Sequence, residues 1–413
     1  MKLIYTFSIY LYLFAIHIAS LFNTKAKLWI DGRKNIFQKL KSQLPISENG
    51  LIWFHCASLG EFEQGRPLIE KIKKEFPETK ILLTFFSPSG YEIRKNYSGA
   101  DYIYYLPMDT PSAAKKFIGI VKPKIAIFVK YEFWFNYLNE LKQQHVPAYL
   151  ICGVFREDQH FFKSYGAWFR KQLNCFSHFY LQDETSKILL ENSGLNNVTI
   201  TGDTRFDRVF EISKNVKQID IVKQFVADEK IIIAGSTWDE DIKIISGLDL
   251  HAYGFKLIIA PHEIDEPTIK STIQQFNNLT IVRYSQANEQ NIKTADVLII
   301  DNIGMLSSLY QYGTIAFIGG GFGKGIHNIL EAATFGLPTI FGPNYSNFIE
   351  AKELIYLRGA FSVSGTNELK KTIDLLNQPD NLMTASTSSG NYVLSRTGAT
   401  DRIFKSIFEH KVL

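Results

Sequence analysis

The sequence predicts an α/β protein built from two doubly wound, Rossmann-like domains that follow an apolar N-terminal helix. From residue 51 onward, short β-branched and aromatic runs alternate with amphipathic segments, which is typical of parallel βαβ units. The charged stretch 204–229 carries no strand signal and divides these runs into two series. A chain of 413 residues is also too long for a single core and suits two domains.

The β-rich runs give the expected strands of each domain. In the first series we expect strands over 51–58, 80–86, 102–107, 124–129, 148–153, 178–182 and 198–203. In the second series we expect them over 231–236, 256–261, 279–284, 297–301, 314–320 and 338–343. Open parallel sheets bind ligands at the carboxyl ends of their strands, so we expect both sheets to present that edge to a cleft between the domains.

The domain boundaries follow from these two series. We place a membrane-anchor helix at 1–23, an N-terminal domain at 24–205, a hinge at 206–228, a C-terminal domain at 229–395 and a C-terminal helix at 396–413.

The N-terminal segment is the most unusual part of the chain. Residues 3–22 contain no charged side chain, and a helix of this length could span the roughly 30 Å core of a bilayer. A cleaved signal peptide is one interpretation, although the cleavage pattern around Ala19 and Ser20 is poorly formed. A core helix is another. We favour an anchor, because Lys2 alone precedes the segment whereas six basic residues follow within 25–41, a bias that keeps the body in the cytoplasm.

The overall composition is that of a folded globular protein, with 46% apolar and 21% charged residues. A net charge of +4 favours an anionic substrate or membrane surface and is too low to indicate a nucleic-acid-binding protein. The three cysteines, Cys56, Cys152 and Cys175, follow no metal-ligand spacing, so we interpret them as reduced thiols.

The first candidate site is the segment ASLGE (57–61), which follows a predicted strand and opens a helix. It brings Ser58, Gly60 and Glu61 to the edge where a ligand is expected. A carboxylate in this place can accept a proton from an attacking hydroxyl as a general base, and the helix N-terminus favours its ionised form. The alternative is that Glu61 only complements the helix dipole.

The second candidate site is the glycine-rich segment 319–328, which follows the predicted strand 314–320. Glycines such as Gly320 permit close backbone approach to a phosphate, and a following helix offers free N–H groups. The spacing matches neither the dinucleotide fingerprint nor a P-loop. His327, Asn328 and Glu331 are spaced to share one helical face, which favours nucleotide binding. A plain helix entry with a solvated face is the alternative.

Weaker signals lie at the ends of neighbouring strands. Ser236 and Thr237 could donate hydrogen bonds to a phosphate, or Ser236 could be an ordinary N-cap. His262 ends the next strand, where a lone histidine is more often structural, and the turn containing Gly304 could present backbone groups to a base. Glu132 ends a strand of the first series at the same edge as Glu61.

Other chemistry is not indicated. Arg205 could neutralise an anionic ligand, although surface solvation is the default for a single basic residue. No Asp-x-Asp motif with supporting ligands ends a strand, so we expect a metal-independent mechanism and no cofactor. There is no G-x-S-x-G elbow to suggest a hydrolase.

Taken together, these motifs resemble the Kdo (3-deoxy-D-manno-octulosonic acid) transferases of lipopolysaccharide assembly, which have the GT-B glycosyltransferase fold. The resemblance runs from the N-terminal segment nearly to the C-terminus. The matching segments are ASLGE (57–61), EFWFN (132–136), VTITGDTRFD (198–207), AGST (234–237), DNIG (301–304), FIGGG (317–321), HNILE (327–331) and GP (342–343).

This resemblance implies an inverting, metal-independent transfer of Kdo from CMP-Kdo to the lipid A precursor, lipid IVA, at the cytoplasmic face of the inner membrane. The N-terminal domain would bind the acceptor and the C-terminal domain the nucleotide sugar. Glu61 resembles the family's catalytic base, and Glu132 resembles a second carboxylate that shapes the site. The expected donor contacts are Ser236, Thr237, His262, Gly304, Gly320, Asn328 and Glu331, and the expected acceptor or phosphate contacts are Ser58, Gly60 and Arg205.

The sequence departs from the family pattern in three places, one of which is the segment around Phe155 and Arg156, where the family has a serine- and arginine-rich loop. The family's Pro-Arg-His is Pro261-His262-Glu263 here, so a nucleotide-binding arginine is absent or replaced, and Lys130 stands where the family has a carboxylate. Two alternatives stay open. One is another GT-B enzyme that uses a UDP-sugar, such as an epimerase or a different lipid-linked sugar transferase. The other is a non-catalytic membrane scaffold.

Overall fold

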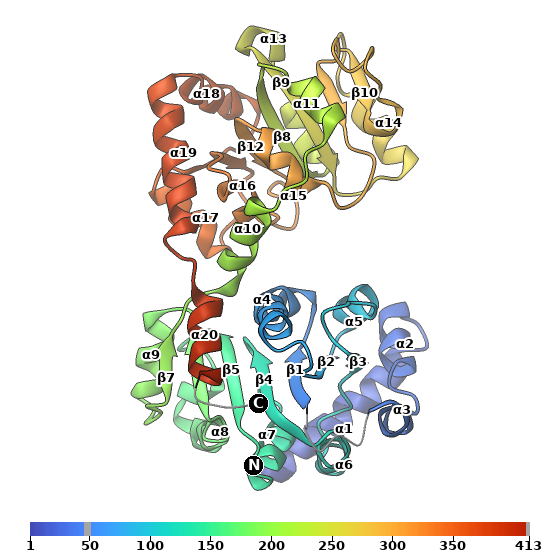
Figure 1. Ribbon diagram of the computed structural model, residues 1–413, viewed down its shortest axis with the longest axis vertical. Coiled ribbons are helices and arrows are strands. Elements are labelled where there is room, and N and C mark those ends of the chain that lie inside the picture. The colour runs from blue at the N-terminus through green and yellow to red at the C-terminus, as the bar shows by residue number, and fades with distance from the viewer. Residues whose placement is uncertain (45–50, 410–413) are drawn as a thin grey trace. The chain divides into compact units, whose positions relative to one another are not determined.

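The computed structural model describes residues 1–44 and 51–409. The chain divides into two compact units, with unit 1 comprising Met1–Asp207 and Thr397–Leu413, and unit 2 comprising Arg208–Arg396 (Figure 1). The division falls inside the expected hinge range 206–228, and the chain returns to unit 1 after unit 2 is complete.

Unit 1 is built on a parallel sheet that, within the described residues, has seven strands in the order β3-β2-β1-β4-β5-β6-β7. All seven strands expected from the first series are present. Their bounds are β1 (Leu51–Cys56), β2 (Ile81–Phe85), β3 (Tyr102–Tyr105), β4 (Pro123–Val129), β5 (Ala148–Gly153), β6 (His178–Leu181) and β7 (Val198–Ile200). The order reverses between β1 and β4, which makes the gap between these two strands the topological switch point.

The helices of unit 1 precede, connect and follow these strands. They are α1 (Lys2–Ala19), α2 (Thr24–Asp31), α3 (Ile36–Gln43), α4 (Leu59–Glu75), α5 (Pro88–Arg94), α6 (Pro111–Val121), α7 (Phe135–Gln143), α8 (Ala167–Leu173), α9 (Glu184–Glu191) and α20 (Ala399–Phe408), with short 3-10 turns at His160–Phe162 and Ser164–Gly166. The expected C-terminal helix is therefore α20, and the last four residues of the expected range lie outside the described residues.

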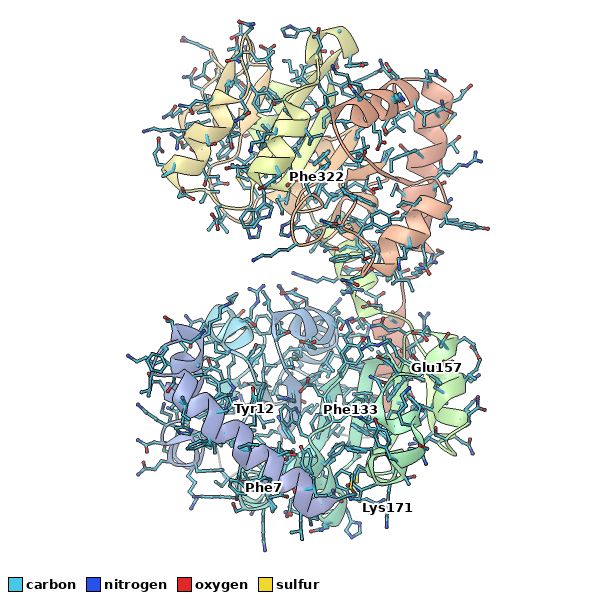
Figure 2. All side chains as sticks on the ribbon, turned by 180° about the vertical axis from the view of Figure 1, so that it is seen from behind. Phe7, Tyr12, Phe133, Glu157, Lys171 and Phe322 are labelled. Atoms are coloured by element: carbon cyan, nitrogen blue, oxygen red, sulfur yellow. The ribbon has the colours of Figure 1, made fainter. Side chains whose placement is uncertain are left out.

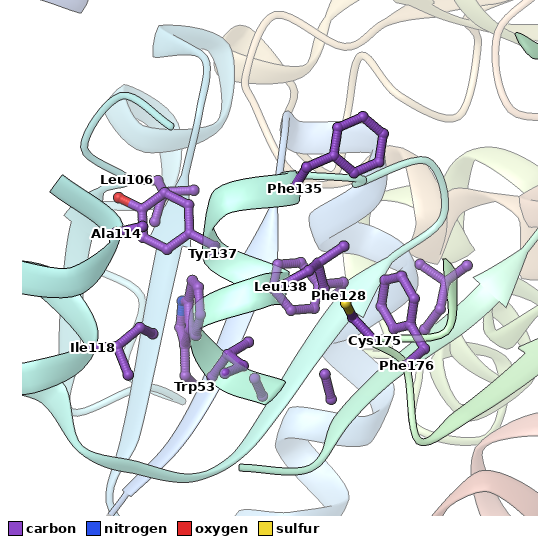
Figure 3. Close-up of a cluster of buried hydrophobic side chains, with 14 of the residues drawn as sticks. Trp53, Leu106, Ala114, Ile118, Phe128, Phe135, Tyr137, Leu138, Cys175 and Phe176 are labelled. Atoms are coloured by element: carbon purple, nitrogen blue, oxygen red, sulfur yellow. The ribbon is translucent and has the colours of Figure 1, made fainter. Parts of the chain in front are cut away.

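The core of unit 1 lies on both faces of its sheet. All six residues of β1 are buried, which explains why its sequence is an almost continuous apolar run. On one face Trp53 packs against Phe117, Phe128 and Tyr137 with ring centroids 5.0–5.7 Å apart (Figure 3). Large aromatic side chains of this kind bury much apolar surface, so this cluster anchors the strands that carry the site.

Helix α1 lies along unit 1 and is held there by one of its faces (Figure 2). The Tyr5 hydroxyl donates to the Asp109 carboxylate at 2.5 Å, and the Tyr5 ring packs edge-on against Phe135 at 5.0 Å. Further along the helix, Ile9 is buried in a cluster with Trp29. These contacts of Tyr5 and Ile9, one turn apart in the first half of α1, hold the helix on the surface of the unit.

The opposite face of α1 is exposed and apolar. Its large exposed side chains include Leu3, Phe7, Leu11, Phe14 and Ile18, which recur at the spacing of one helical face. The helix is long and apolar enough to cross a membrane, although a signal sequence or a core helix can have the same length and composition. The structure adds that only one face of this apolar helix is covered by the unit.

Unit 2 is built on a second parallel sheet, with seven strands among the described residues in the order β10-β11-β9-β8-β12-β13-β14. The six expected strands are present, and a seventh, β14, was not predicted. Their bounds are β8 (Lys230–Thr237), β9 (Phe255–Pro261), β10 (Ile281–Arg283), β11 (Val297–Ile299), β12 (Ile315–Ile318), β13 (Thr339–Phe341) and β14 (Ala360–Ser362). The switch point of this sheet lies between β8 and β12.

The remaining helices complete unit 2, and the first of them begins in unit 1, before Arg208. They are α10 (Thr204–Lys214), α11 (Asp220–Val226), α12 (Asp239–Ile245), α13 (Leu250–Tyr253), α14 (Glu266–Gln274), α15 (Leu306–Leu309), α16 (Leu330–Ala333), α17 (Ile349–Tyr356), α18 (Thr366–Leu376) and α19 (Pro379–Leu394), with 3-10 turns at Tyr284–Gln286 and Tyr310–Tyr312. The expected hinge range thus contains α11 and most of α10. The two parallel, doubly wound sheets confirm the predicted fold class.

Candidate functional site

The switch point of unit 1 brings the segments that follow β1 and β4 to the same edge of the sheet. Strands β1 and β4 are paired in parallel with His55 opposite Phe128, so their carboxyl ends lie together at one edge of the sheet. Ser58 lies two residues beyond β1, and Glu132 lies three residues beyond β4. This is the edge at which open α/β sheets bind ligands.

Glu61 lies in the first turn of α4 and folds back onto the start of that helix. Its Oε2 accepts a hydrogen bond from the Ser58 backbone N–H at 3.0 Å and another from the Ser58 hydroxyl. This arrangement is a capping box, which satisfies backbone donors that a helix start leaves free. The carboxylate is half-buried and Gly60 beside it is exposed. The contacts of Glu61 are therefore those of a residue that caps its own helix. The role of Glu61 as a general base stays a prediction.

Glu132 is buried, with 7% of its surface exposed, and is held by two ring N–H groups. His55 Nε2 lies 3.0 Å from its Oε2, and Trp134 Nε1 donates to the same oxygen. The other ring nitrogen of His55 lies 2.9 Å from the Thr84 hydroxyl. Such a connected buried network fixes the loop after β4 at the switch point.

The sequence interpretation missed His55. Its only signal was a polar residue in the apolar strand that leads into the segment 57–61, and a lone histidine in a strand is usually a core residue. Both carboxylates act on the Cys56 thiol, the next residue in β1. Burial raises its pKa well above the usual value, and the negative charges of Glu61 and Glu132 raise it further.

Arg205 lies at the start of α10 and is held by a buried carboxylate. Its Nε donates to Asp203 Oδ2 at 2.8 Å, and Gln64 Nε2 reaches the same carboxylate at 3.2 Å. Gln64 lies three residues after Glu61 on α4, so this network links Arg205 to the helix that carries Glu61. Asp203 neutralises Arg205, so any contact of Arg205 with an anionic ligand would be shared with that carboxylate.

The switch point of unit 2 brings together the end of β8 and the glycine-rich segment. The Gly319 N–H donates to the Gly235 carbonyl at 2.9 Å. A Cβ on Gly319 would lie 2.2 Å from the Ser236 carbonyl oxygen, so only glycine allows this approach. Ser236 itself has a φ of 53°, and Thr237 beyond it is buried with a hydroxyl that has no partner among the described residues.

Asp241 fixes this turn and was also missed by the sequence interpretation. Its Oδ2 accepts from the Gly320 N–H at 2.9 Å and from the Trp238 N–H at 2.8 Å. Gly320 has a φ of 89°, a conformation that favours glycine. Burial raises the pKa of Asp241, while these two backbone donors counteract the rise. No sequence motif singles out Asp241, because it belongs to an acidic run of the kind that is typical of the first turn of a helix.

Three rings stack at the same edge of unit 2. Trp238 and His262 have centroids 4.4 Å apart, and His262 and His327 have centroids 4.7 Å apart, both with an interplanar angle of 27°. Trp238 Nε1 donates to His327 Nε2 at 3.2 Å. Burial and the neighbouring His262 lower the pKa of His327. The predicted contact His262 thus lies beside the glycine turn.

The polar residues at the end of the glycine-rich segment are not arranged as expected. We expected His327, Asn328 and Glu331 to share one helical face, and this is wrong because α16 begins only at Leu330. The backbone before it is held in a loop, where the His327 N–H bonds the Gly319 carbonyl at 3.1 Å. Asn328 nevertheless donates to Glu331 Oε1 at 3.0 Å.

The turn that contains Gly304 leads to Glu331 from another direction. Gly304 is exposed with a φ of 90°, and Ser307, three residues later, donates to Glu331 Oε2 at 3.1 Å. The predicted donor contacts of unit 2 therefore gather around β8, β12 and the segment before α16. In residues 1–44 and 51–409 no group of three His, Cys, Asp or Glu side chains is placed to hold a metal ion.

Comparison with known proteins identifies the chain's relatives. Residues 32–208 match the family described as 3-Deoxy-D-manno-octulosonic-acid transferase (kdotransferase). A 3-deoxy-D-manno-octulosonic acid transferase of Aquifex aeolicus is 30% identical over 333 residues, which cover 78% of this chain and 84% of that protein. A bifunctional glycosyltransferase/methyltransferase of Fusobacterium nucleatum is 28% identical over 348 residues. These cover 81% of this chain and 54%, about half, of that longer protein.

The solved structures show the fold. The UDP-GlcNAc 2-epimerase of Neisseria meningitidis matches with a TM-score of 0.61 at 16% identity, over 87% of this chain and all of that chain. Such a match shows the GT-B-like architecture of two doubly wound units and nothing about substrate. With the extended similarity to the Aquifex protein, the chain belongs to the Kdo transferase family of glycosyltransferases.

Proposed function

We propose that the chain transfers Kdo from CMP-Kdo to the lipid A precursor, lipid IVA, in an inverting and metal-independent reaction. Family membership supports Kdo as the transferred sugar. The observation that carries the mechanism is the position of Glu61, a half-exposed carboxylate at the switch point of unit 1.

In this proposal Glu61 is the general base. It takes the proton of an acceptor sugar hydroxyl while that oxygen bonds to the anomeric carbon of Kdo. The bond from this carbon to the CMP phosphate breaks, and CMP leaves with the bonding electrons. A single displacement of this kind inverts the anomeric centre. Proton transfer to a positioned base contributes about 10²–10⁴-fold to such reactions.

Glu132 acts as a positioning residue, because His55 and Trp134 already occupy its buried oxygen. Ser58, Gly60 and Arg205 are proposed to contact the acceptor or its phosphates. In unit 2, Ser236, Thr237 and the N–H groups around Gly320 are proposed to receive the CMP phosphate. His262, Gly304, Asn328 and Glu331 would receive the nucleoside, with Glu331 on the ribose.

The test separates the base from the helix cap. Glutamine can replace glutamate in a capping box, so Glu61→Gln keeps the start of α4 while removing the base. With a CMP-Kdo generating system and lipid IVA, and products resolved by mass, we expect the variant to lose about 10²–10⁴-fold in turnover. Its affinity for CMP and its unfolding temperature should stay unchanged. The control is Glu75→Gln on the exposed end of the same helix, which should leave turnover unchanged.

Three results would contradict the proposal. Full turnover by Glu61→Gln would show that Glu61 is not the base. Turnover of a UDP-sugar in place of CMP-Kdo would show that the donor is a different nucleotide sugar. Loss of turnover in the presence of a chelator, restored by a divalent cation, would overturn the metal-independent mechanism.

We also propose that the protein works at the cytoplasmic face of the inner membrane, attached through α1. The exposed apolar face of α1 and the basic residues that follow it support this placement. Deleting residues 1–23 would also uncover Trp29 and Asp109, so the sharper test replaces only Leu11, Phe14 and Ile18 with serine. We expect this variant to stay folded and to leave the membrane fraction. If it remains bound to membranes, another surface carries the attachment.

A further inference from the structure

Unit 1 contains a cavity of about 670 Å³ between α1, α2, α3 and the start of α6. Its volume lies in the range of about 300–1,000 Å³ that is typical of small-ligand sites. None of the residues proposed above for sugar transfer lines it. The cavity therefore needs an explanation of its own.

The wall of the cavity is largely apolar and begins at α1. Leu13 of α1 and Ile36 and Phe37 of α3 all line it. On the same helix Leu11 and Phe14 are exposed on the outer face. The cavity is therefore bordered by the same helix that presents an exposed apolar face.

The cavity also gathers positive charge. Arg33, Lys34 and Lys116 line it, and no aspartate or glutamate is among its described lining residues. The Lys116 ammonium lies 4.5 Å from the centre of the Phe37 ring, which places it against the apolar wall. Lys34 pairs with Asp31 at 2.6 Å, and both of these side chains are well exposed. The net charge around the cavity thus matches an anionic group.

Arg33 is the lining residue that most favours an anionic ligand. Its guanidinium lies 3.6 Å above the Trp29 ring and donates to the backbone carbonyls of Leu106, Trp29 and Phe86 at 2.7–3.0 Å. These bonds use three of its five N–H donors. No carboxylate pairs with it within residues 1–44 and 51–409, and burial lowers its pKa to about 9. A desolvated cation of this kind is stabilised when an anion joins it.

Two further polar groups around the cavity also favour an anionic ligand. Trp29 is buried and lines the cavity, and its Nε1 has no hydrogen-bond partner among the described residues. Ser112 lines the cavity from the first turn of the 11-residue helix α6, where helix N–H groups favour negative charge.

We propose that this cavity binds one anionic phospholipid of the bilayer, with an acyl chain along the apolar wall and the phosphate on Arg33 and Lys116. The bound lipid would fill the space beside α1 and tie the helix to both the unit and the membrane. The inference uses the proposed membrane attachment and is independent of the sugar-transfer chemistry.

The test measures lipid binding directly, without turnover. Full-length protein in a neutral detergent is titrated calorimetrically with three probes. The first is dihexanoyl phosphatidylglycerol below its micelle concentration, the second is dihexanoyl phosphatidylcholine, and the third is inorganic phosphate. We expect the anionic lipid to bind at least about tenfold more tightly than either of the others, because only it combines a chain with net negative charge.

Two neighbouring lysines of α6 provide a matched pair of variants. Lys116→Glu should weaken binding of the anionic lipid about tenfold or more, whereas Lys115→Glu makes the same charge change on an exposed residue outside the cavity and should change it less than about twofold. Ala113→Leu narrows the cavity without changing charge and should also weaken binding.

Each contrary outcome overturns the proposal in a different way. Equal affinity for inorganic phosphate would make the cavity a simple anion site. Equal affinity for the phosphatidylcholine would make it an apolar site. Equal effects of the two lysine variants would reduce the binding to general surface charge. A loss of Kdo transfer by Glu61→Gln would bear on none of these results.

Discussion

At the scale of single residues, Asp109 shows how one buried carboxylate organises the N-terminal part of unit 1. It is fully buried and accepts hydrogen bonds from the Tyr5 hydroxyl at 2.5 Å and from the backbone N–H groups of Asn136 and Tyr137 at 3.1 and 3.0 Å. Burial raises its pKa to about 6, although these hydrogen bonds act in the opposite direction. The side chain therefore joins α1 to the start of α7 and carries a proton more readily than a free aspartate.

The raised pKa of Asp109 predicts a pH dependence of stability. Between its unfolded value near 3.8 and its folded value of about 6, the folded state binds more protons than the unfolded state. The contribution of Asp109 is therefore fully present below about pH 4 and is lost as the pH rises through about 6. The loss is about 3 kcal/mol, from 1.36 kcal/mol for each pKa unit.

The measurement compares wild type with Asp109→Asn in urea unfolding followed by tryptophan fluorescence. Trp29, Trp53, Trp134 and Trp168 belong to unit 1, so four of the five tryptophans report on it. We expect the stability difference, wild type minus variant, to fall between pH 4 and 6 and to be flat above. Asp158→Asn at an exposed position should show no such change. A difference that rises with pH would mean that Asp109 is normally ionised in the folded protein.

For single residues, part of the candidate site could be predicted from the sequence and part could not. Glu61 and Glu132 could be predicted because each follows a recognisable strand, and strand ends define the binding edge of a parallel sheet. His55 and Asp241 could not, because their importance comes from partners 77 and 79 residues away in the chain. Pairings of this kind depend on tertiary structure and leave no local pattern.

At the scale of elements, the turn after β12 depends on close backbone packing. Besides Gly319 against Ser236, a Cβ on Gly321 would lie 2.5 Å from the Gly342 nitrogen. By contrast, the nearest atom to a Cβ on Gly323 would be the Gly320 oxygen at 3.7 Å, an ordinary contact. Two glycines of this turn are thus required by sterics, whereas Gly323 is not.

This contrast gives a matched prediction for unit 2. Gly319→Ala forces the ends of β8 and β12 apart, and we expect it to cost about 1–3 kcal/mol in unfolding free energy, as overpacking does. Gly323→Ala should change stability by less than about 0.5 kcal/mol, as surface substitutions usually do. Calorimetric unfolding tests both, and CMP titration tests whether the nucleotide affinity follows. Equal behaviour of the two variants would mean that the turn relaxes without cost.

Helix α1 is the element for which the structure adds most to the sequence. We interpret residues 3–22 as an anchor from their lack of charge and from the basic residues that follow them. Composition cannot tell a helix that crosses a bilayer from one that lies on a protein surface with its outer face in the membrane. The buried contacts of Tyr5 and Ile9 supply that information, because they hold the helix along the unit.

The geometry of α1 predicts equal membrane depth along its outer face. We expect fluorescent labels on cysteines introduced singly at Leu3, Leu11 and Ile18 to be quenched to the same extent by nitroxide lipids of one fixed depth. An interfacial helix gives this pattern because its apolar face enters the bilayer by about 5–10 Å along its whole length. A cysteine at the buried Ile9 is the unlabelled control. Quenching that changes steadily from Leu3 to Ile18 would show that α1 crosses the membrane.

At the scale of the whole molecule, the sequence predicted two doubly wound sheets and thirteen of their strands, because parallel strands buried on both faces read as apolar runs. The strand that was missed, β14, has three residues and follows a short loop, so its pattern is too brief to detect. Unit 1 consists of two segments that are far apart in the chain, one of them at the C-terminal end, and this could not be predicted either. Contacts between segments two hundred residues apart decide it.

Helix α20 carries those contacts and completes unit 1. Its Ile403, Ile407 and Phe408 are buried in the core beside β1 and β4, and α20 packs against α4 (Figure 1). Asp207 holds the start of the segment, accepting from the Gly398 N–H at 2.5 Å and from the Thr400 N–H at 2.6 Å. Burying a large apolar side chain contributes about 1.5–3 kcal/mol, so this helix supplies a substantial part of the stability of unit 1.

Weakening or removing α20 should therefore destabilise unit 1 alone. Ile403→Ala should lower the unfolding free energy of unit 1 by about 2–5 kcal/mol, and deletion of residues 397–413 should lower it further. Amide hydrogen exchange resolves the effect by segment. We expect faster exchange in β1 and β4 and unchanged exchange in β8 and β12, because α20 belongs to unit 1 and its buried side chains lie in the core of that unit. Lys405→Ala on the exposed face of α20 should leave both sheets protected. Faster exchange in β8 and β12 of the Ile403 variant would mean that the two units unfold together rather than as separate structural units.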